Sequence, residues 1–292
     1  MKFTDAPIVG VTGTYYPDIA DPRFEISLET VEAWRDHNLP LVIIDHDPDK
    51  NDRAKKAYRQ RGATVINATT AGIATQRQQG AEFALSAGAE KLLTHEPEKP
   101  SVPVIAQDVA VELDTHSVVV IGRSDSSLET VPPFQLRTEK LAGYVLERTL
   151  RMPFDTLAGP RGYSRQGAQH LIDYPSHKPG MNNWIYLYDT ILAARSNGEA
   201  VGGIAVDLMY PEKLVAQETN NPIFDRKRLD QFWLQLRYMM DRPEVLPEAR
   251  GLARMVKHEL DSVPANAGQK DLESTFARIE ALASSEYGYQ AP

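Results

Sequence analysis

The stretch Lys91-Leu92-Leu93-Thr94-His95-Glu96-Pro97-Glu98-Lys99-Pro100 decides how the rest of the chain is interpreted. Its first four residues form a short apolar run that predicts a buried strand. Glu96 and Glu98 follow where the run stops, and residues two apart in an extended segment point to the same side. Pro97 biases Glu96 toward extended geometry. The two acids are therefore expected to face one hard divalent cation that in turn holds phosphates, with a solvated acidic turn as the alternative.

Four other apolar runs have the same character as this strand. They are the stretches Pro7–Gly13, Leu41–Ile44, Ala63–Ile66 and Ser117–Ile121. Each run is continuous rather than alternating, and helical patterns such as residues 73–87 separate the runs. This alternation of strand and helix predicts a parallel sheet with helices on both faces.

Polar clusters follow the predicted strands. They are Thr14–Asp18, Asp45–Asp49, Thr69–Arg77 and His95–Glu98. Parallel sheets bind their ligands beyond the carboxyl ends of the strands, so the four clusters are expected to meet at one rim. The alternative is that these are only the polar loops that follow strands in every α/β protein.

The second half of the chain is less regular. Helices are expected at residues 135–151 and 184–197, and a strand is expected at Val201–Met209. Beyond Pro222, amphipathic patterns predict helices at residues 226–240, 247–260 and 270–284. We therefore expect one domain over residues 1–221 and a helical extension over residues 222–292. The extension is expected to shape an acceptor site, form a homodimer surface, or do both.

Composition limits the class of protein. The chain has 292 residues, and its net charge of −8 argues against a surface that holds nucleic acid by its phosphates. It has no cysteine, which excludes disulfides and a cysteine nucleophile. The N-terminus lacks the pattern of a signal peptide, and no apolar run approaches the ~18 residues that span a bilayer. A cytoplasmic protein without a membrane span is expected.

The order of these loops, over about residues 7–210, resembles the GT-A fold of nucleotide-sugar glycosyltransferases. The likeness is greatest to the family-2-like group and its mannosylglycerate- or glucosyl-3-phosphoglycerate-synthase relatives. The matching segments are Thr14-Tyr15-Tyr16-Pro17, Asp45-His46-Asp47-Pro48-Asp49, Gly72-Ile73-Ala74-Thr75-Gln76-Arg77-Gln78-Gln79-Gly80, Glu96-Pro97-Glu98, Ala158-Gly159-Pro160-Arg161-Gly162-Tyr163-Ser164-Arg165 and Trp184-Ile185-Tyr186-Leu187-Tyr188-Asp189. The third of these stands for the family's Gly-x-x-x-x-Arg-Asn-x-Gly segment, and the fourth stands for its Asp-x-Asp metal motif.

The resemblance implies a Rossmann-like, mostly parallel sheet with flanking helices and a helical C-terminal extension. It implies an enzyme that moves a sugar from a nucleotide-diphosphate donor to a small or polymeric hydroxyl acceptor. The residues implied in binding the donor nucleotide are Thr14, Tyr15, Tyr16, Asp45, Asp47, Gly72, Arg77 and Glu96. Those implied in binding the acceptor are Gly159, Arg161, Arg165 and Trp184. Glu96 and Glu98 would hold Mn²⁺ or Mg²⁺, and Asp189 and Glu98 are the implied catalytic groups, with Asp189 the general base if the enzyme inverts configuration.

The chain departs from the family pattern at the metal motif, where both aspartates are replaced by glutamates. This lengthens each ligand by one methylene and leaves three readings open: another ion, metal-independent catalysis in which Lys99 or an arginine neutralises the leaving group, or loss of activity. Two other functions also stay open. One is a nucleotide-binding or scaffold protein of GT-A shape, and the other is a different α/β enzyme such as a nucleotidyltransferase or a doubly wound phosphatase.

Overall fold

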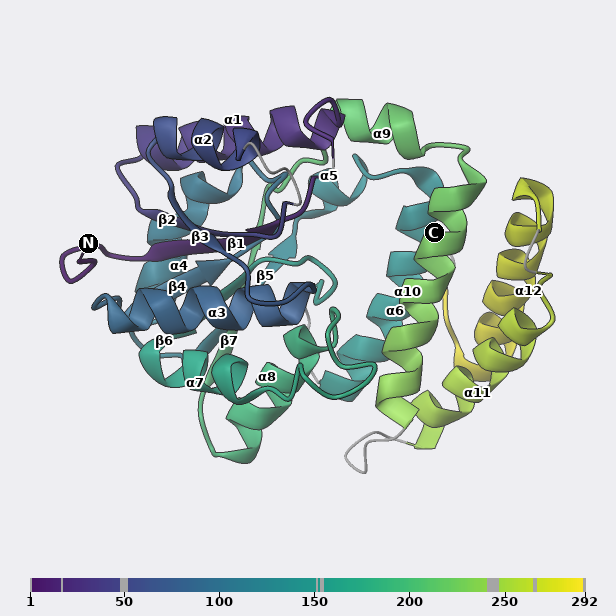
Figure 1. Cartoon of the computed structure of the whole chain (residues 1–292). Helices are drawn as coiled ribbons and strands as arrows, with labels where there is room; N and C mark the ends of the chain where they lie inside the picture. The colour runs from purple at the N-terminus through teal and green to yellow at the C-terminus, as the bar shows by residue number, and fades with distance from the viewer. Residues whose placement is uncertain are drawn as a thin grey trace. The chain divides into compact units, whose positions relative to one another are not determined.

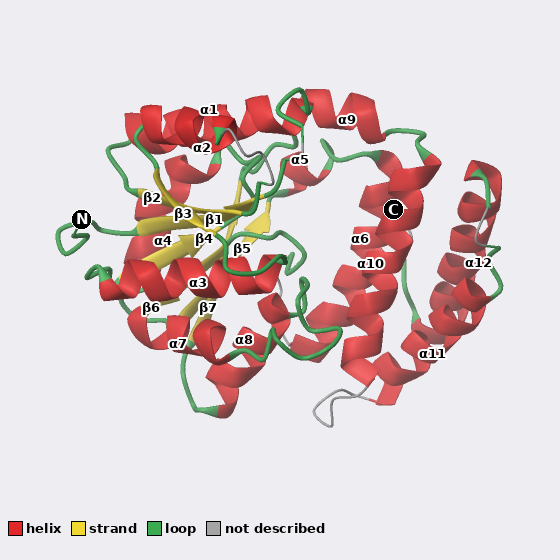
Figure 2. Cartoon of the chain, viewed as in Figure 1, coloured by secondary structure: helices red, strands yellow, loops and turns green. Residues whose placement is uncertain are grey.

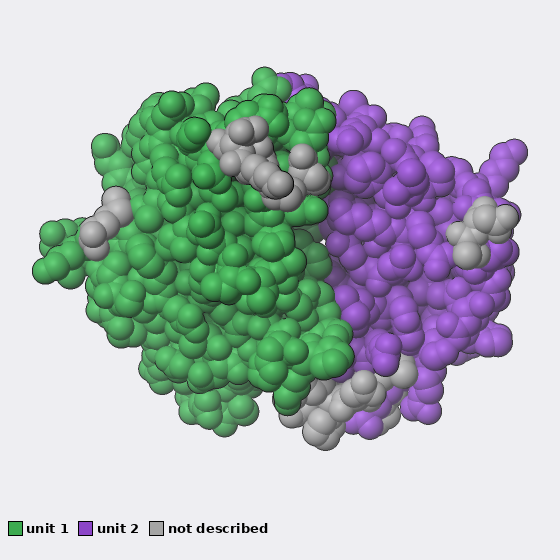
Figure 3. Space-filling model, viewed as in Figure 1, with its two compact units in different colours: residues 1–124, 158–211 green, residues 125–157, 212–292 purple. Residues whose placement is uncertain are grey.

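The structure of the protein is a computed structural model. It describes residues 2–16, 18–47, 52–150, 152, 155–240, 247–264 and 267–290. The chain forms two compact units, which Figure 3 colours separately. Unit 1 contains Met1–Ser124 and Ala158–Pro211, and unit 2 contains Asp125–Leu157 and Glu212–Pro292.

Unit 1 is built on a single sheet. Within the described residues its seven strands are β1 (Val9–Thr14), β2 (Leu41–Asp45), β3 (Thr64–Asn67), β4 (Lys91–Thr94), β5 (Val118–Arg123), β6 (Arg161–Ser164) and β7 (Val201–Val206). Their order in the sheet is β3-β2-β1-β4-β6-β5-β7. All neighbours are parallel except β6, which runs antiparallel to both β4 and β5. The predicted α/β fold with a mostly parallel sheet is confirmed.

Helices cover both faces of this sheet, as Figures 1 and 2 show. The helices of unit 1 are α1 (Pro22–Asp36), α2 (Arg53–Gln60), α3 (Ile73–Ser86), η1 (Val102–Ile105), α4 (Ala106–Glu112), α7 (Arg165–Asp173) and α8 (Tyr186–Ser196). Helices α3, α7 and α8 lie on one face, and α1, α2 and α4 lie on the other. Every residue of β2 and β5 is buried between these layers, which explains why these strands are continuous apolar runs.

The local sequence of helix α1 explains how it begins and how it packs against β1. Asp21 caps the helix by accepting from the Arg23 amide at 2.9 Å, and Pro22 stands where a missing N–H costs nothing. The helix then buries Trp34 completely. A Cβ at Gly10 in β1 would lie 2.7 Å from the indole, so glycine is what allows helix and strand to approach this closely.

Unit 2 is helical. Its helices are α5 (Asp125–Leu128), α6 (Pro133–Leu150), α9 (Glu212–Glu218), α10 (Pro222–Met240), α11 (Pro247–Asp261) and α12 (Gln269–Tyr287). The division expected from sequence put residues 125–157 with the sheet, whereas the compact units place this segment with the C-terminal helices. Within unit 2, α6 packs against α10, α11 and α12, and Phe134 at the start of α6 lies 5.5 Å from Phe276 of α12, measured between ring centroids.

The described helices include none that is long and apolar enough to cross a membrane.

Candidate functional site

Four polar loops meet at one end of the sheet, beyond the carboxyl ends of the parallel strands, because of the strand register. Thr14 pairs with Asp45, so β1 and β2 end together. Thr94, the last residue of β4, pairs with Arg161, the first residue of the antiparallel β6. The loops after β1, β2 and β4 therefore lie at the same end of the sheet as the loop that leads into β6. Ligands of α/β sheets bind at ends of this kind.

The acidic turn after β2 is built around Asp45. The Thr14 hydroxyl donates to Oδ1 of this carboxylate, and the backbone N–H of Asp47 donates to Oδ2 at 3.2 Å. Only 2% of Asp45 is exposed, and burial raises its pKa against the opposing effect of these hydrogen bonds. Asp45 therefore fixes the shape of the turn. Asp47 is also buried, whereas Pro48 and Asp49 of the predicted motif lie outside the described residues.

The tyrosine pair after β1 divides between surface and core. Tyr15 is 53% exposed, and its ring centroid lies 5.9 Å from that of His46. Tyr16 is only 2% exposed, and its hydroxyl donates to Oε1 of Glu98 at 2.6 Å. Only Tyr15 is thus exposed enough to stack on a ligand, while Tyr16 ties the loop after β1 to the loop after β4.

The two glutamates after β4 point to different neighbours. Glu98 faces Tyr16, and burial raises its pKa, with a smaller contribution of the same sign from the charge of Glu96. Glu96 lies against the loop before β6, where a Cβ at Gly159 would come within 1.6 Å of its Oε1. Its Oε2 is buried without a hydrogen-bond partner. Pro97 and Glu98 form a turn, so the extended geometry expected from the sequence does not continue through this motif.

His95 belongs to the core beneath this turn. Its ring stacks on that of Trp34, with 5.4 Å between the ring centroids, and its Nδ1 lies 2.7 Å from the Glu96 carbonyl oxygen. Burial lowers the pKa of His95 to about 3, so the imidazole is neutral and Nδ1 donates this hydrogen bond. The histidine thus orients the backbone of Glu96 from below.

Arg77 lies inside unit 1 rather than on its surface. It is 1% exposed, and its Nη2 donates to the carbonyl oxygen of His95. Its Nε and Nη1 are buried without hydrogen-bond partners. The structure therefore places this predicted phosphate ligand beneath the end of β4, where it holds the backbone that precedes Glu96.

The predicted Gly72 lies at the start of α3 in a backbone conformation with φ +122° that only glycine adopts easily. Asn182, from the segment before α8, covers this glycine, and a Cβ there would lie 2.1 Å from the Asn182 amide nitrogen. The Asn182 side chain donates to the Ala71 carbonyl at 2.8 Å and accepts from the Thr75 amide at 3.2 Å. Asn182 thus caps α3 at the sheet edge. Sequence reasoning missed it, because no local pattern links two residues a hundred positions apart.

The predicted acceptor residues do not all come together. Arg161 is completely buried and donates to the Pro160 carbonyl at 2.7 Å, so it shapes the loop that contains Gly159. Arg165 lies at the other end of β6, on the opposite edge of the sheet, where it pairs with Glu90 at 3.0 Å. Because β6 is antiparallel, its first residue, Arg161, lies at the carboxyl end of β4, and Arg165 lies at the opposite end.

Trp184 lies just before α8 and Asp189 lies in its first turn, and both are partly buried. Between them, Tyr186 is completely enclosed: burial raises its pKa, Arg77 opposes this rise, and the charge of Glu96 adds to it. The start of α8 therefore lies close to the glutamate turn. Among the described residues no three histidine, aspartate or glutamate side chains form a group that could hold a metal ion, so a cation would depend on Glu96, Glu98 and its own ligand.

No family model and no curated protein matches the sequence. Among solved structures, the chain is similar to a protein of Desulfovibrio desulfuricans G20 described as a nucleotide-diphospho-sugar transferase, with 10% identity, TM-score 0.45, and coverage of 80% of this chain and 98% of that one. It is also similar to glucosyl-3-phosphoglycerate synthase from Mycobacterium tuberculosis in complex with phosphoglyceric acid, with 11% identity, TM-score 0.49, and coverage of 80% and 81%.

A third structure is 4-diphosphocytidyl-2C-methyl-D-erythritol synthase from Anaerococcus prevotii DSM 20548, with 14% identity, TM-score 0.44, and coverage of 76% of this chain and 96% of that one. The first two are enzymes of the kind that the sequence resembles.

Proposed function

We propose that the protein is a glycosyltransferase that moves a sugar from a nucleotide-diphosphate donor to a hydroxyl acceptor. The main support is the hydrogen bond between Tyr16 and Glu98, which joins the loops after β1 and β4 beside the Thr14–Asp45 pair. An exposed aromatic ring, an aspartate turn and two carboxylates thereby share the sheet edge where α/β folds bind their ligands.

The donor nucleotide would lie across the loops after β1 and β2. The exposed ring of Tyr15, beside His46, offers a flat surface on which a nucleobase can stack. The Asp45 carboxylate has two occupied oxygens, but each keeps a second lone pair that can accept from the base or the ribose. These residues bind and orient, and they take no part in the chemical step.

The carboxylates after β4 fit a divalent cation that is shared with phosphates. Mg²⁺ commonly takes only one or two protein carboxylates and completes its shell with phosphates and water. Glu96 offers a buried oxygen without a partner, and Glu98 keeps its second oxygen beside the one that Tyr16 holds. Mn²⁺ or Mg²⁺ bound there would neutralise charge on the leaving diphosphate.

The acceptor would lie between the Gly159 loop and the start of α8. Trp184 would contact the acceptor, and Gly159 lets Glu96 approach the loop without a clash. Arg161 contributes by holding the loop, and Arg165 has no part in the site. If the reaction inverts configuration, Asp189 removes the proton from the attacking hydroxyl.

A thermal-shift screen with UDP, GDP, CDP and ADP, each with and without Mn²⁺, tests this function. A nucleotide at a hundred times its Kd stabilises a protein by about 2.7 kcal/mol, which corresponds to a rise in Tm of about 5–10 °C. The double change Glu96→Gln and Glu98→Gln should remove the part of the shift that depends on Mn²⁺. The matched control is Glu90→Gln, at the opposite edge of the sheet.

Further assays of the same protein distinguish the proposed function from the alternatives. If no nucleoside diphosphate raises the Tm at millimolar concentration, the protein is not a donor-dependent glycosyltransferase. Release of pyrophosphate from a nucleoside triphosphate would instead identify a nucleotidyltransferase. Nucleotide binding with no sugar transfer to any hydroxyl acceptor would indicate a binding or scaffold protein.

A further inference from the structure

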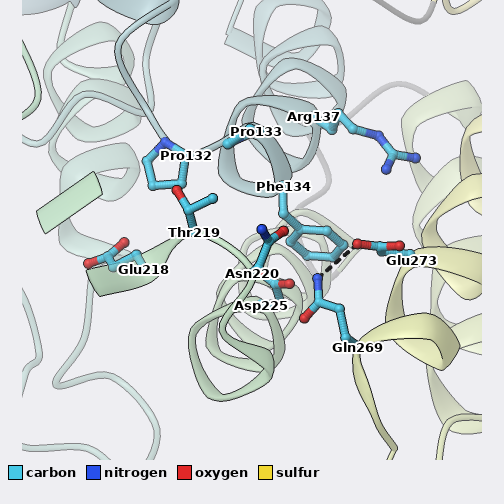
Figure 4. A pocket seen from close by; sticks show the side chains of 10 residues that line it. All are labelled: Pro132, Pro133, Phe134, Arg137, Glu218, Thr219, Asn220, Asp225, Gln269 and Glu273. Carbon is cyan, nitrogen blue, oxygen red and sulfur yellow. Dashed lines mark hydrogen bonds between the residues drawn. The ribbon is translucent and has the colours of Figure 1, made fainter. Parts of the chain in front are cut away.

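Unit 2 contains a cavity of about 80 Å³ that the proposed sugar transfer does not use. Figure 4 shows the side chains that line it, which come from the start of α6, the turn between α9 and α10, and the start of α12. They are Pro132, Pro133, Phe134, Arg137, Glu218, Thr219, Asn220, Asp225, Gln269 and Glu273. A water molecule occupies about 30 Å³ in the liquid, so the cavity has room for a small organic group.

Two arginines, Arg137 of the lining and Arg228 near it, are already in ion pairs. Arg137 binds Glu280 at 2.5 Å, and Arg228 binds Glu218 at 2.8 Å. In Figure 4 the guanidinium of Arg137 extends away from the turn between α9 and α10. Two carboxylates of the lining, those of Asp225 and Glu273, take part in neither ion pair. The cavity therefore carries excess negative charge.

Asp225 is the unusual member of this pair. An acid in the first turn of a helix is ordinarily exposed and interacts with the helix dipole. Asp225 is instead 4% exposed, and its Oδ2 has no hydrogen-bond partner. Burial raises the pKa of Asp225 and the nearby charge of Glu273 adds to the rise, while a hydrogen bond from Gln269 and the charge of Arg228 oppose it. A buried carboxylate oxygen without a hydrogen-bond partner costs stability, so Oδ2 points to a ligand that supplies the missing donor.

Two further oxygens of the lining also lack a hydrogen-bond partner. The Thr219 hydroxyl oxygen and the Gln269 amide oxygen are buried, and neither has a hydrogen-bond partner. The orientation of the Gln269 amide is fixed because its nitrogen donates to Oε1 of Glu273 at 2.9 Å. The buried unpartnered atoms of the ten lining residues are thus all oxygens. A ligand that satisfies them must bring donors and positive charge.

We propose that this cavity binds the primary ammonium group of a small alkylamine. An ammonium carries three N–H donors and no acceptor, which matches oxygens from Asp225, Thr219 and Gln269. The Phe134 ring and the two prolines before it give the alkyl chain an apolar wall. A metal ion fits less well, because no three acidic or histidine side chains among the described residues form a metal-holding group.

Isothermal titration of the full chain with propylammonium chloride tests the proposal, with propanol, tetramethylammonium and sodium chloride as controls at equal concentration. We expect saturable binding of propylammonium at millimolar concentration and no binding of the controls, which lack charge or N–H donors. Asp225→Asn should weaken the binding at least about tenfold, since the charge-assisted hydrogen bond is lost. Asp230→Asn, an exposed change on the same helix, should leave it unchanged.

A second measurement covers the case in which a variant folds poorly. Without ligand, Asp225→Asn should raise the Tm, because it removes a buried charge, one oxygen of which has no hydrogen-bond partner. The proposal is overturned if propylammonium does not bind at about 10 mM, or if wild type and Asp225→Asn bind it equally. It is also overturned if Ca²⁺ or Mn²⁺, and not the amine, binds in a way that depends on Asp225.

Discussion

Tyr16 donates a hydrogen bond to Oε1 of Glu98 at 2.6 Å, although the two residues lie 82 positions apart in the chain. Tyr16 follows β1 and Glu98 follows β4, which are neighbours in the sheet. The sheet thus brings a buried phenol to the Glu96-Pro97-Glu98 motif, which resembles the Asp-x-Asp metal motif of GT-A transferases in sequence order. The role of Tyr16 is to position this carboxylate, whereas the exposed Tyr15 is the residue available to a ligand.

Tyr16→Phe should lower both stability and donor binding. The change leaves the partly buried Glu98 carboxylate without its donor, and hydrogen bonds to charged groups contribute about 1.5–3 kcal/mol. Chemical denaturation should show a loss of this size, and the Mn²⁺-dependent thermal shift with nucleotide should shrink. Tyr15→Phe is the matched control, because its ring is exposed and no loss of stability is expected. Equal effects of the two changes would contradict this division of roles.

Glu98→Gln should change how stability depends on pH. The pKa of Glu98 is raised above its ordinary 4.5, mainly by burial, so the folded protein holds this proton more tightly than the unfolded chain does. Stability is then lost as pH rises from 4.5 through the raised pKa, by about 1.4 kcal/mol for each pKa unit. The amide oxygen of glutamine still accepts from Tyr16, so the variant should be more stable than wild type at neutral pH.

Urea denaturation at neutral pH and near pH 4.5 measures this difference. The stabilisation should be large at the higher pH and small at the lower one, and it should come with loss of Mn²⁺-dependent activity. A variant that is less stable than wild type at neutral pH would show that the charged form of Glu98 stabilises the fold.

Gly159→Ala should reduce activity more than stability. The added methyl would lie 1.6 Å from Oε1 of Glu96, which is the end of a flexible side chain and can move aside. The fold survives, but the carboxylate leaves its place, and we expect a drop in kcat of about tenfold to a hundredfold. Adding Glu96→Asp, which shortens the acid, should restore part of the rate.

The control for this change is Gly143→Ala, where an added methyl meets its nearest neighbour only at 3.9 Å. If Gly159→Ala retains full activity, Glu96 does not act in the position that the structure gives it.

The sequence predicted the sheet well where strands are continuous apolar runs, as in β2 and β5, because burial on both faces requires such runs. It missed β6 (Arg161–Ser164), which has no apolar run although its first three residues are buried. The family resemblance implied that Arg165 binds the acceptor, whereas the structure places it at the opposite end of β6, where it pairs with Glu90. In an antiparallel strand the first residue, not the last, lies at the carboxyl ends of the parallel strands. Only the pairing with distant strands shows that β6 has this direction.

The sequence indicated where the polar loops lie but not where their side chains point. Four strand ends predicted that these loops meet, and the register places the ends of β1, β2 and β4 together. Whether Arg77 faces a phosphate or the core depends on packing that involves His95 and Trp34, which come from two other segments. Periodicity within α3 carries no information about those partners. The same holds for Asn182, which caps α3 from beyond α7.

Arg77→Lys distinguishes the two interpretations of this arginine. In the structure its guanidinium is buried and donates to the His95 carbonyl, so the shorter lysine leaves a buried charge without a partner. We expect a loss of about 3–5 kcal/mol in the free energy of unfolding. Arg59→Lys is the matched control, because Arg59 also donates to a backbone carbonyl but is exposed. Nucleotide affinity of the folded Arg77→Lys protein, measured by titration, should fall only slightly. A large fall in affinity with unchanged stability would instead place Arg77 on the phosphates, as the sequence suggested.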